Sequence, residues 1–600
     1  MNRISIRDGV LFSTLAAVAM TLYDYYFMGH MQHEMLPVIY RIMDPEYLNN
    51  DLFTNGSELF NEDYWFSKFI IALSNLASLP VVFFALNIVA NIASALAAFF
   101  TARYLFKDNN VAGILAVVLV LCVMTMRLGY GSPPIRANFI ASHMVRPLLY
   151  FAIYMAFKQK PIAVAILAGL AALVHPLEGP GTGGILLAAM AATLVWNGEK
   201  SLGKYLQIGL SFVMVLAAAL VYVIPYFEQS SQGIPDDIFI EINLFRFPHH
   251  YLPSVFLTPT ELLVGAGFIG AVVLATGAWM RSFTEERTWK RTFLSTCVIL
   301  VLLCFLGYLF VEIWPSRIWL IAQTWRFLYI FKWIGQLMLA GITAQYIYQK
   351  GLLKSVPIWL SMVQPLATTA TILSTRTNLK TSPKLLWGIQ FVVLVVVVYL
   401  SRNLLKTQLP LFALLSAIAL VLFSVSRKAH VLSWIGLAIF IAGLNFLNPV
   451  SDAVNGKGLH FKGYFRPIIY AKQHSYKTRE ISEFIKANTP ENSVIMLPAP
   501  LSVVRILSER ALFVDLSIPM EDHAMQEWFE RMKLQYKIPS SNIGTLRDYD
   551  VMRIDLTDQE LLNIKKKYTL DYVITKAEHS TQFPVLFESS GFKLLQLPTK

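Results

Sequence analysis

Residues 205–226 read YLQIGLSFVMVLAAALVYVIPY, a run of 22 residues without a charged side chain. A helix needs about 20 apolar residues to cross the hydrocarbon core of a bilayer. Similar runs lie at 9–28, 82–105, 111–127, 141–157, 161–176, 182–197, 259–280, 292–313, 327–349, 384–401, 408–426 and 430–448. The pattern predicts a polytopic α-helical membrane protein with about 13 transmembrane helices.

The composition excludes a soluble globular protein. The chain has 600 residues, of which 56% are hydrophobic and 15% are charged, whereas ordinary soluble domains carry about 25% charged residues. The net charge of +12 does not indicate nucleic-acid binding, because the basic residues punctuate apolar runs instead of forming a soluble basic patch. All three cysteines lie inside apolar segments. We therefore expect neither a disulfide framework nor a cysteine metal site.

The density of charge divides the chain in two. Residues 460–600 contain 36 charged side chains, whereas the preceding 459 residues contain only 52. We predict a membrane domain at 1–455 and a soluble domain at 456–600. Helical patterns in the soluble domain alternate with strand-like runs at 494–497, 512–515, 571–575 and 592–596. This alternation favours an α/β fold with a small, largely parallel sheet, and the absence of a Gly-rich phosphate-binding turn argues against a nucleotide site.

Lysine and arginine in short loops predict the orientation, because they favour the cytoplasmic side. Arg3 and Arg7 place the N-terminus inside, and the basic loops near 103–107, 158–160, 200–204 and 281–291 then fall inside at alternate connections. The segment 352–373 is ambiguous, because a full crossing there would make the C-terminal domain cytoplasmic. We interpret it as a re-entrant or interfacial segment, which places the C-terminal domain outside. The expected location is a bacterial cytoplasmic (inner) membrane.

The first external loop, residues 29–66, is the first candidate site. A connector between two helices needs only a few residues, so a loop of about 38 suggests binding or catalysis. Asp44, Glu46 and Asp51 lie within eight residues of one another. One of them could act as a general base, and Asp44 and Glu46 could hold a divalent cation such as Mg or Mn. The alternative is that these acids are solvated turn formers. No other cofactor is expected.

Other ionisable groups lie close to the first predicted helix. Asp24 lies at the outer end of that helix, and an ionisable group at or near membrane depth is by default a functional candidate. The alternative for Asp24 is an interfacial carboxylate within a belt of tyrosines. The loop then continues with His33 and Glu34, which belong to an H-x-x-H-E run at 30–34. The histidine spacing is a weak signal for zinc, and we do not predict a zinc site.

Basic residues recur in the later outer connections. Several cations on one membrane face could bind a phosphate or diphosphate. We favour Arg326 for this role, with Lys332 about 9 Å further along the predicted helix, and with Arg146 and His175 as further phosphate-binding candidates. The remaining candidates for the same pocket are Arg136, His143, Arg246, His249 and His250.

This arrangement resembles the GT-C superfamily of integral-membrane glycosyltransferases. The resemblance rests on the long acidic first loop between Asp24 and Phe53, and more loosely on His175–Pro176 and on Gln323–Arg326. It implies that Asp44, Glu46 or Asp51 is the catalytic base or a metal ligand. It also implies that Arg326, with Lys332, holds the phosphate of a polyprenyl-linked sugar donor. The acidic pair is D-x-E with an intervening proline, and the W-W-D-Y-G signature of oligosaccharyltransferases is absent, which argues against an N-glycosylating enzyme.

The resemblance implies transfer of a sugar from a polyprenyl-(di)phosphate-linked donor to an extracytoplasmic glycan, lipid or protein acceptor. A single displacement assisted by one base would invert the anomeric centre. The expected partners are the bilayer, the donor and the acceptor, and no nucleic acid. Two alternatives remain open: a transporter or flippase, and a polymerase or ligase, each of lipid-linked saccharides. Transporters often show duplicated halves, and their absence here favours an enzyme.

Overall fold

The structure is a computed structural model of the chain. It describes residues 4–29, 31–58, 63–122, 128, 139–230, 233–282, 287–362, 365–376, 409–424, 476–519, 521–541, 543–589 and 591–598. The spans predicted at 384–401 and 430–448, and the domain boundary predicted near 455, lie outside the described residues.

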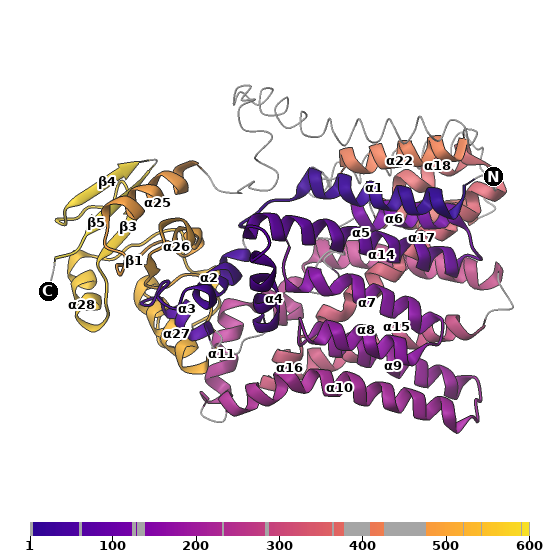
Figure 1. The fold of residues 1–600 in the computed structure, drawn as a ribbon, viewed down its shortest axis with the longest axis horizontal. Coiled ribbons are helices and arrows are strands. Elements are labelled where there is room, and N and C mark those ends of the chain that lie inside the picture. The colour runs from indigo at the N-terminus through magenta and orange to yellow at the C-terminus, as the bar shows by residue number, and fades with distance from the viewer. Residues whose placement is uncertain are drawn as a thin grey trace.

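The membrane domain is a bundle of helices that lie side by side (Figure 1). Its main helices are α1 (Ile6–Asp24), α5 (Leu79–Leu105), α6 (Asn110–Cys122), α7 (Ala141–Phe157), α8 (Pro161–Ala172), α9 (Glu178–Trp196), α10 (Leu202–Ser230), α14 (Pro259–Ser282), α15 (Arg287–Tyr308), α17 (Leu328–Lys350) and α22 (Leu409–Ser424). Within the described residues, six helical stretches are long and apolar enough to cross a membrane. The prediction of a polytopic membrane protein is confirmed, and the count of 13 spans stays a prediction.

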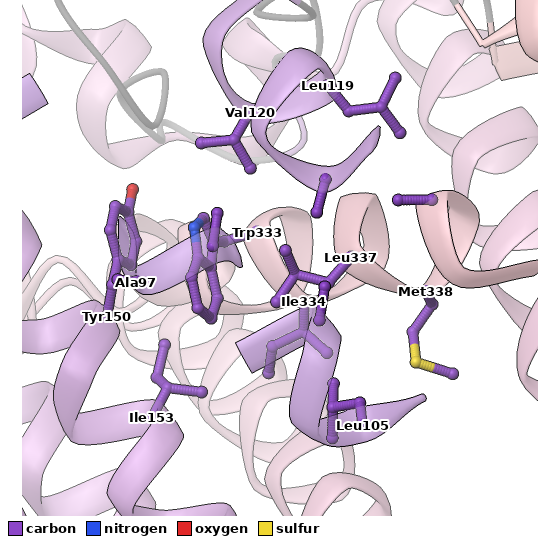
Figure 2. Packing of buried hydrophobic residues seen from close by; sticks show 14 of the residues in the cluster. Ala97, Leu105, Leu119, Val120, Tyr150, Ile153, Trp333, Ile334, Leu337 and Met338 are labelled. Atoms are coloured by element: carbon purple, nitrogen blue, oxygen red, sulfur yellow. The ribbon is translucent and has the colours of Figure 1, made fainter. Parts of the chain in front are cut away.

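The centre of the bundle is formed by α6 and α17, which pack closely on each other. Figure 2 shows Tyr150 of α7 and Trp333 of α17 ring to ring beside α6, and their centroids lie 4.6 Å apart in a stacked arrangement. Small residues allow the close approach of neighbouring backbones. A Cβ atom on Gly341 of α17, for example, would lie 1.9 Å from the Phe106 ring. Because α6 and α17 are surrounded by other helices, their sequences are apolar on all sides.

The ambiguous segment 352–373 consists of two helices instead of one. α18 (Leu352–Ser361) packs on α17, and α19 (Pro365–Arg376) packs on α14. Pro365 begins α19. The N–H of the first helical residue has no partner within the helix, so a proline, which lacks that N–H, is tolerated there. The interruption agrees with the interpretation of this segment as something other than a single straight span. Its course across the membrane stays a prediction.

The C-terminal domain is an α/β unit. Among its described residues, β1 (Val494–Met496), β2 (Ala511–Leu512), β3 (Tyr572–Lys576), β4 (Val585–Ser589) and β5 (Phe592–Gln596) form a sheet of order β2-β1-β3-β5-β4. Its helices are α25 (Tyr476–Asn488), α26 (Val503–Ser508), α27 (Asp522–Tyr536) and α28 (Asp558–Lys567), with short 3-10 turns η4 (Ala499–Leu501) and η5 (Leu546–Asp548). The predicted α/β class is confirmed.

The sheet is less parallel than the sequence suggests. β1 is parallel to β2 and to β3, but β5 is antiparallel to β3 and to β4. The last two strands form a hairpin, and Gly591 in its turn has a φ of +87°, a conformation that favours glycine. The strand predicted at 512–515 is also shorter than expected, because β2 ends at Leu512.

The C-terminal domain lies at the same end of the bundle as the first external loop (Figure 1). The loop contains α2 (Gln32–Met43) and α3 (Leu52–Glu58), and α4 (Tyr64–Ser74) begins at its C-terminal end. α2 packs on α26 and α3 packs on α27. α11 (Asp236–Arg246), which follows α10, also packs on α27. The loop and the domain therefore share one side of the membrane domain, as the topology predicts, while the identity of that side stays a prediction.

Candidate functional site

Arg146 of α7 and Glu178 of α9 form a buried ion pair inside the membrane domain. Nε and Nη2 of Arg146 donate to the two carboxylate oxygens at 2.6 and 2.7 Å. The two side chains are only 2% and 1% exposed. Removing two charges from water costs several kcal/mol each, and the attraction between them often fails to offset this. A buried pair inside a membrane domain is therefore better explained by function than by stability.

One edge of the Arg146 guanidinium is left without an acceptor. Its Nη1 is buried and has no hydrogen-bond partner among the described residues. The guanidinium carbon lies 3.7 Å from the centre of the Tyr329 ring. The Tyr329 hydroxyl and Thr182 Oγ1 are 2.6 Å apart. A held guanidinium with a free N–H edge is suited to an oxyanion such as a phosphate.

Two more predicted phosphate-binding residues lie beside Glu178. His175 accepts a hydrogen bond at Nδ1 from the Glu178 backbone N–H, at 3.4 Å. Arg326 is half-buried in η2 (Thr324–Phe327), which packs on α9, the helix that begins at Glu178. The fold thus gathers Arg146, His175 and Arg326 around one carboxylate. Lys332 is 4% exposed and follows on α17, about 9 Å further along the axis at the usual rise.

The backbone leading to Arg326 is irregular. A π-helical segment η1 (Leu309–Ile313) ends α15, then α16 (Arg317–Ala322) and the 3-10 turn η2 (Thr324–Phe327) lead into α17. Gln323 between them has a φ of +42°, which is uncommon for a residue other than glycine. Buried Gln323 Oε1, Thr324 Oγ1 and Trp325 Nε1 have no hydrogen-bond partner among the described residues. Such unsatisfied atoms in one segment indicate a polar ligand or ordered water.

A second buried polar network lies next to the ion pair on α7. His143 Nε2 is 2.9 Å from Asn91 Oδ1, and Asn91 Nδ2 donates to Thr21 Oγ1 at 2.8 Å. Because His143 and Arg146 are separated by about one helical turn, the two networks form one layer across α1, α5, α7 and α9. We call Thr21, Asn91, His143, Arg146 and Glu178 the polar layer.

The N-terminal end of α2 contacts the helices near this layer. Gln32 Nε2 donates to the Phe139 carbonyl oxygen at 2.8 Å, and the Phe139 ring lies 5.8 Å from the His143 ring. His33 is 8% exposed, and its Nε2 is 2.9 Å from the Met28 carbonyl oxygen. Half-buried Glu34 follows in the first turn of α2. Glu34 is therefore a carboxylate at this end of α2. Asp24 is the last residue of α1, and its side chain lies outside the described part.

Asp44 and Glu46 lie at the opposite end of α2. Twelve residues separate Gln32 from Asp44, or about 18 Å at the helical rise. Both acids are exposed, and Asp44 Oδ1 accepts a hydrogen bond from the Glu46 backbone N–H at 3.1 Å. Within the described residues, no group of three or more His, Cys, Asp or Glu side chains could hold a metal ion. The geometry thus fits turn formation, and the base and cation roles of these two acids stay predictions.

Asp51 has a different environment from Asp44 and Glu46, and its role as base or metal ligand stays a prediction. It is fully buried, its Oδ2 accepts from Arg505 Nε at 2.9 Å and from the Leu512 N–H at 2.8 Å, and its Oδ1 accepts from the Thr54 N–H at 2.8 Å. The last bond is typical of an N-cap, because Asp51 directly precedes α3. The carboxylate is therefore saturated by internal donors and joins the first loop to the C-terminal domain.

The other pocket candidates lie elsewhere. Arg246 of α11 donates from Nε to the Leu516 carbonyl oxygen of the C-terminal domain at 2.7 Å. His249 and His250 belong to α12 (Pro248–Tyr251), which precedes α13 (Pro253–Phe256), and the His250 ring stacks on Phe247. These contacts place Arg246 at the junction of α11 with the C-terminal domain. Arg136 lies outside the described residues.

Glu178 is the main residue that the sequence did not single out. It lies in the short connection between the spans predicted at 161–176 and 182–197, and a carboxylate so close to two spans is a signal in itself. Tyr329 and Thr182 carry no such signal, because each sits inside an apolar run. Their proximity to Arg146 becomes visible only once α7, α9 and α17 are packed.

The chain was compared with family models, curated proteins and solved structures. Residues 476–534 match a family model described as a domain of unknown function (DUF6798). No curated protein matches the chain. Among solved structures, the chain is similar to ArnT from Cupriavidus metallidurans, crystallised with bound undecaprenyl phosphate; the identity is 11%, the TM-score is 0.48, and the match covers 98% of this chain and 97% of that chain. The family match is confined to the C-terminal domain.

Proposed function

We propose that the protein is a membrane glycosyltransferase that moves a sugar from a polyprenyl-(di)phosphate-linked donor to an extracytoplasmic glycan, lipid or protein. The observation that carries this proposal is the buried Arg146–Glu178 pair with its free Nη1 edge. Arg326 and His175 beside Glu178 add positive charge and a further ring nitrogen. A phosphate attached to a lipid reaches such a place from within the bilayer.

The charge requirements of the reaction match this arrangement. When the bond between the anomeric carbon and the phosphate oxygen breaks, the electron pair leaves with the lipid phosphate. Fixed donors in a low-dielectric site stabilise that developing charge more strongly than water does. The Nη1 edge of Arg146 supplies two N–H groups, and Glu178 keeps the guanidinium oriented through its other edge. Arg326 would balance the remaining negative charge.

The acceptor needs a base. Its hydroxyl oxygen attacks the anomeric carbon while its proton passes to a carboxylate, and one such displacement inverts the centre. We assign the base to Glu34, in the first turn of α2, or to Asp24, the last residue of α1, because the N-terminal end of α2 contacts the chain near the polar layer. The alternatives are Asp44, about 15 Å further along α2 than Glu34, and Glu46 just beyond the end of α2.

The test is binding of undecaprenyl phosphate, followed by transfer. Native mass spectrometry on the purified chain in nanodiscs would compare wild type with the double variant Arg146→Gln/Glu178→Gln, which removes both charges together. Loss of one charge-assisted contact is worth about 1.5–3 kcal/mol, so binding should weaken roughly 10- to 100-fold. The matched control is Arg291→Gln, whose partners Trp196 and Asn197 lie at the opposite end of α9. Equal binding by the double variant and the wild type would contradict the proposal.

A flippase or transporter of lipid-linked saccharides is the second candidate. The observation that favours it is the irregular backbone between Leu309 and Phe327, because interrupted helices at membrane depth are common in transporters. Reconstituted vesicles distinguish the two candidates. Movement of a fluorescent polyprenyl-phosphate sugar between leaflets without release of polyprenyl phosphate would favour the transporter, and release of polyprenyl phosphate would favour the enzyme.

A further inference from the structure

The matched segment 476–534 contains α26, a short helix that packs directly on the first external loop. Val503 and Ile506 of α26 are buried in one cluster with Met35, Leu36 and Ile39 of α2. This face therefore covers the apolar side of α2. An ordinary surface helix of the C-terminal domain would instead present polar residues here.

Polar side chains in α26 and just before it contact the first external loop at two places. Ser502, which precedes α26, has its Oγ 3.2 Å from Nδ1 of His33, at the N-terminal end of α2. Arg505, one turn later, pairs with Asp51 beyond the C-terminal end of α2. One helical turn in the C-terminal domain thus contacts both the first turn of α2 and the segment that follows α2.

Arg505 also ties this contact to the sheet. Its Nη1 donates to Asp515 Oδ2 at 2.9 Å, and its side chain and those of both partners are at most 1% exposed. Burial opposes the charge of Arg505, but Asp51 and Asp515 more than compensate and raise its pKa. Leu512 of β2 donates its N–H to the same Asp51. The loop carboxylate is therefore held by two donors from the matched segment.

A third contact lies between α3 and α27. The Glu521 N–H donates to the Gly56 carbonyl oxygen at 2.9 Å. A Cβ on Gly56 would lie 2.4 Å from Cβ of Ala524 and 2.8 Å from Cβ of Pro519. The close approach of these two helices depends on the missing side chain of Gly56.

We propose that the segment of unknown function, 476–534, anchors the first external loop, with α26 as the anchoring helix and Arg505 as a positioning residue. The anchor holds α2 so that its N-terminal end, which carries His33 and Glu34, stays against the membrane helices. This consequence for catalysis rests on the proposed function. The anchoring itself does not.

A buried reporter tests the anchor without any assay of activity. Ser57 of α3 is 2% exposed, so a Ser57→Cys variant of the full chain, with Cys122, Cys297 and Cys304 replaced by alanine, should react slowly with a polymer maleimide. Arg505→Ala leaves Asp51 and Asp515 buried without their cation. The labelling rate of the reporter should then rise at least about tenfold, because local opening exposes the loop.

Arg510→Ala is the matched control. Arg510 is also buried in the matched segment, and it donates to Thr489 and to the carbonyl oxygens of Lys486, Ser508 and Glu509, all within that segment. Its loss should leave labelling of Ser57→Cys unchanged. An equal rise of labelling in both arginine variants would show general unfolding of the domain and would overturn the specific role of Arg505.

Gly56→Leu tests the same anchor from the loop side, with the matched segment unaltered. The new side chain must displace Ala524 or Pro519, so labelling should again rise. A reporter that stays protected in both Arg505→Ala and Gly56→Leu would overturn the proposal. Undecaprenyl phosphate binding is measured in parallel and should persist in these variants, because Arg146 lies in the bundle. Absence of binding in the wild type would overturn the proposed function while leaving the result on the anchor intact.

Discussion

Two buried arginines show how similar ion pairs can have different roles. Arg505 at the junction of the loop with the C-terminal domain has two carboxylate partners, and no buried nitrogen of it lacks a partner among the described residues. Arg146 in the membrane domain has one carboxylate partner and a buried Nη1 without one. An arginine whose buried nitrogen atoms are paired within the protein stabilises the structure. An arginine with a buried, unpaired nitrogen can still donate a hydrogen bond to a ligand.

The largest effect on stability is expected when only one partner of the buried Arg146–Glu178 pair is removed. Arg146→Gln leaves the Glu178 carboxylate buried without its cation, which should lower the stability of the chain by about 3–5 kcal/mol. Thermal unfolding followed by tryptophan fluorescence in detergent would measure this. A melting temperature equal to that of the wild type would contradict the view that the pair is buried and desolvated.

The double variant separates the contribution of the Arg146–Glu178 pair to stability from its contribution to binding. Arg146→Gln/Glu178→Gln removes both charges, so most of that stability should return, while weaker undecaprenyl phosphate binding should remain. A difference of about 1 kcal/mol from the wild type is expected in unfolding, because the two amides can still form a hydrogen bond. If stability and binding recovered together, the free edge of Arg146 would have no role in binding.

Asp515→Asn weakens one of the two ion pairs of Arg505 and leaves the other intact. Arg505 retains Asp51, and the amide retains one oxygen that can accept from Nη1. Replacing a charged acceptor by a neutral one should cost about 1–2 kcal/mol. Chemical denaturation of the C-terminal domain within the full chain would measure the change, and undecaprenyl phosphate binding should be unaffected.

The smallest effects are expected at the exposed loop acids. Asp44→Asn and Glu46→Gln change surface turn residues, so stability should move by less than about 0.5 kcal/mol. Transfer should also be retained, whereas Glu34→Gln or Asp24→Asn should reduce it. Measured release of polyprenyl phosphate would compare the four variants. If Asp44→Asn abolished transfer while Glu34→Gln and Asp24→Asn retained it, Asp44 at the C-terminal end of α2 would be the base.

The sequence predicts the positions of many site residues but not their partners. Arg146, His175 and Arg326 were each expected near an outer helix end, and the fold brings them together around Glu178. The three loop acids look equivalent in sequence. Packing separates them, because Asp51 is buried against Arg505 while Asp44 and Glu46 are exposed.

The membrane character and the two-domain division follow from sequence alone. Apolar length and charge density act locally, since a helix satisfies its own backbone hydrogen bonds and needs only an apolar run to enter a bilayer. The pairings that define the site are not local. Arg146 meets Glu178 across 32 residues, and Asp51 meets Arg505 across 454. Only tertiary packing brings such groups within hydrogen-bond distance, so only the structure could distinguish the arginine that is fully paired within the protein from the one that remains open to a ligand.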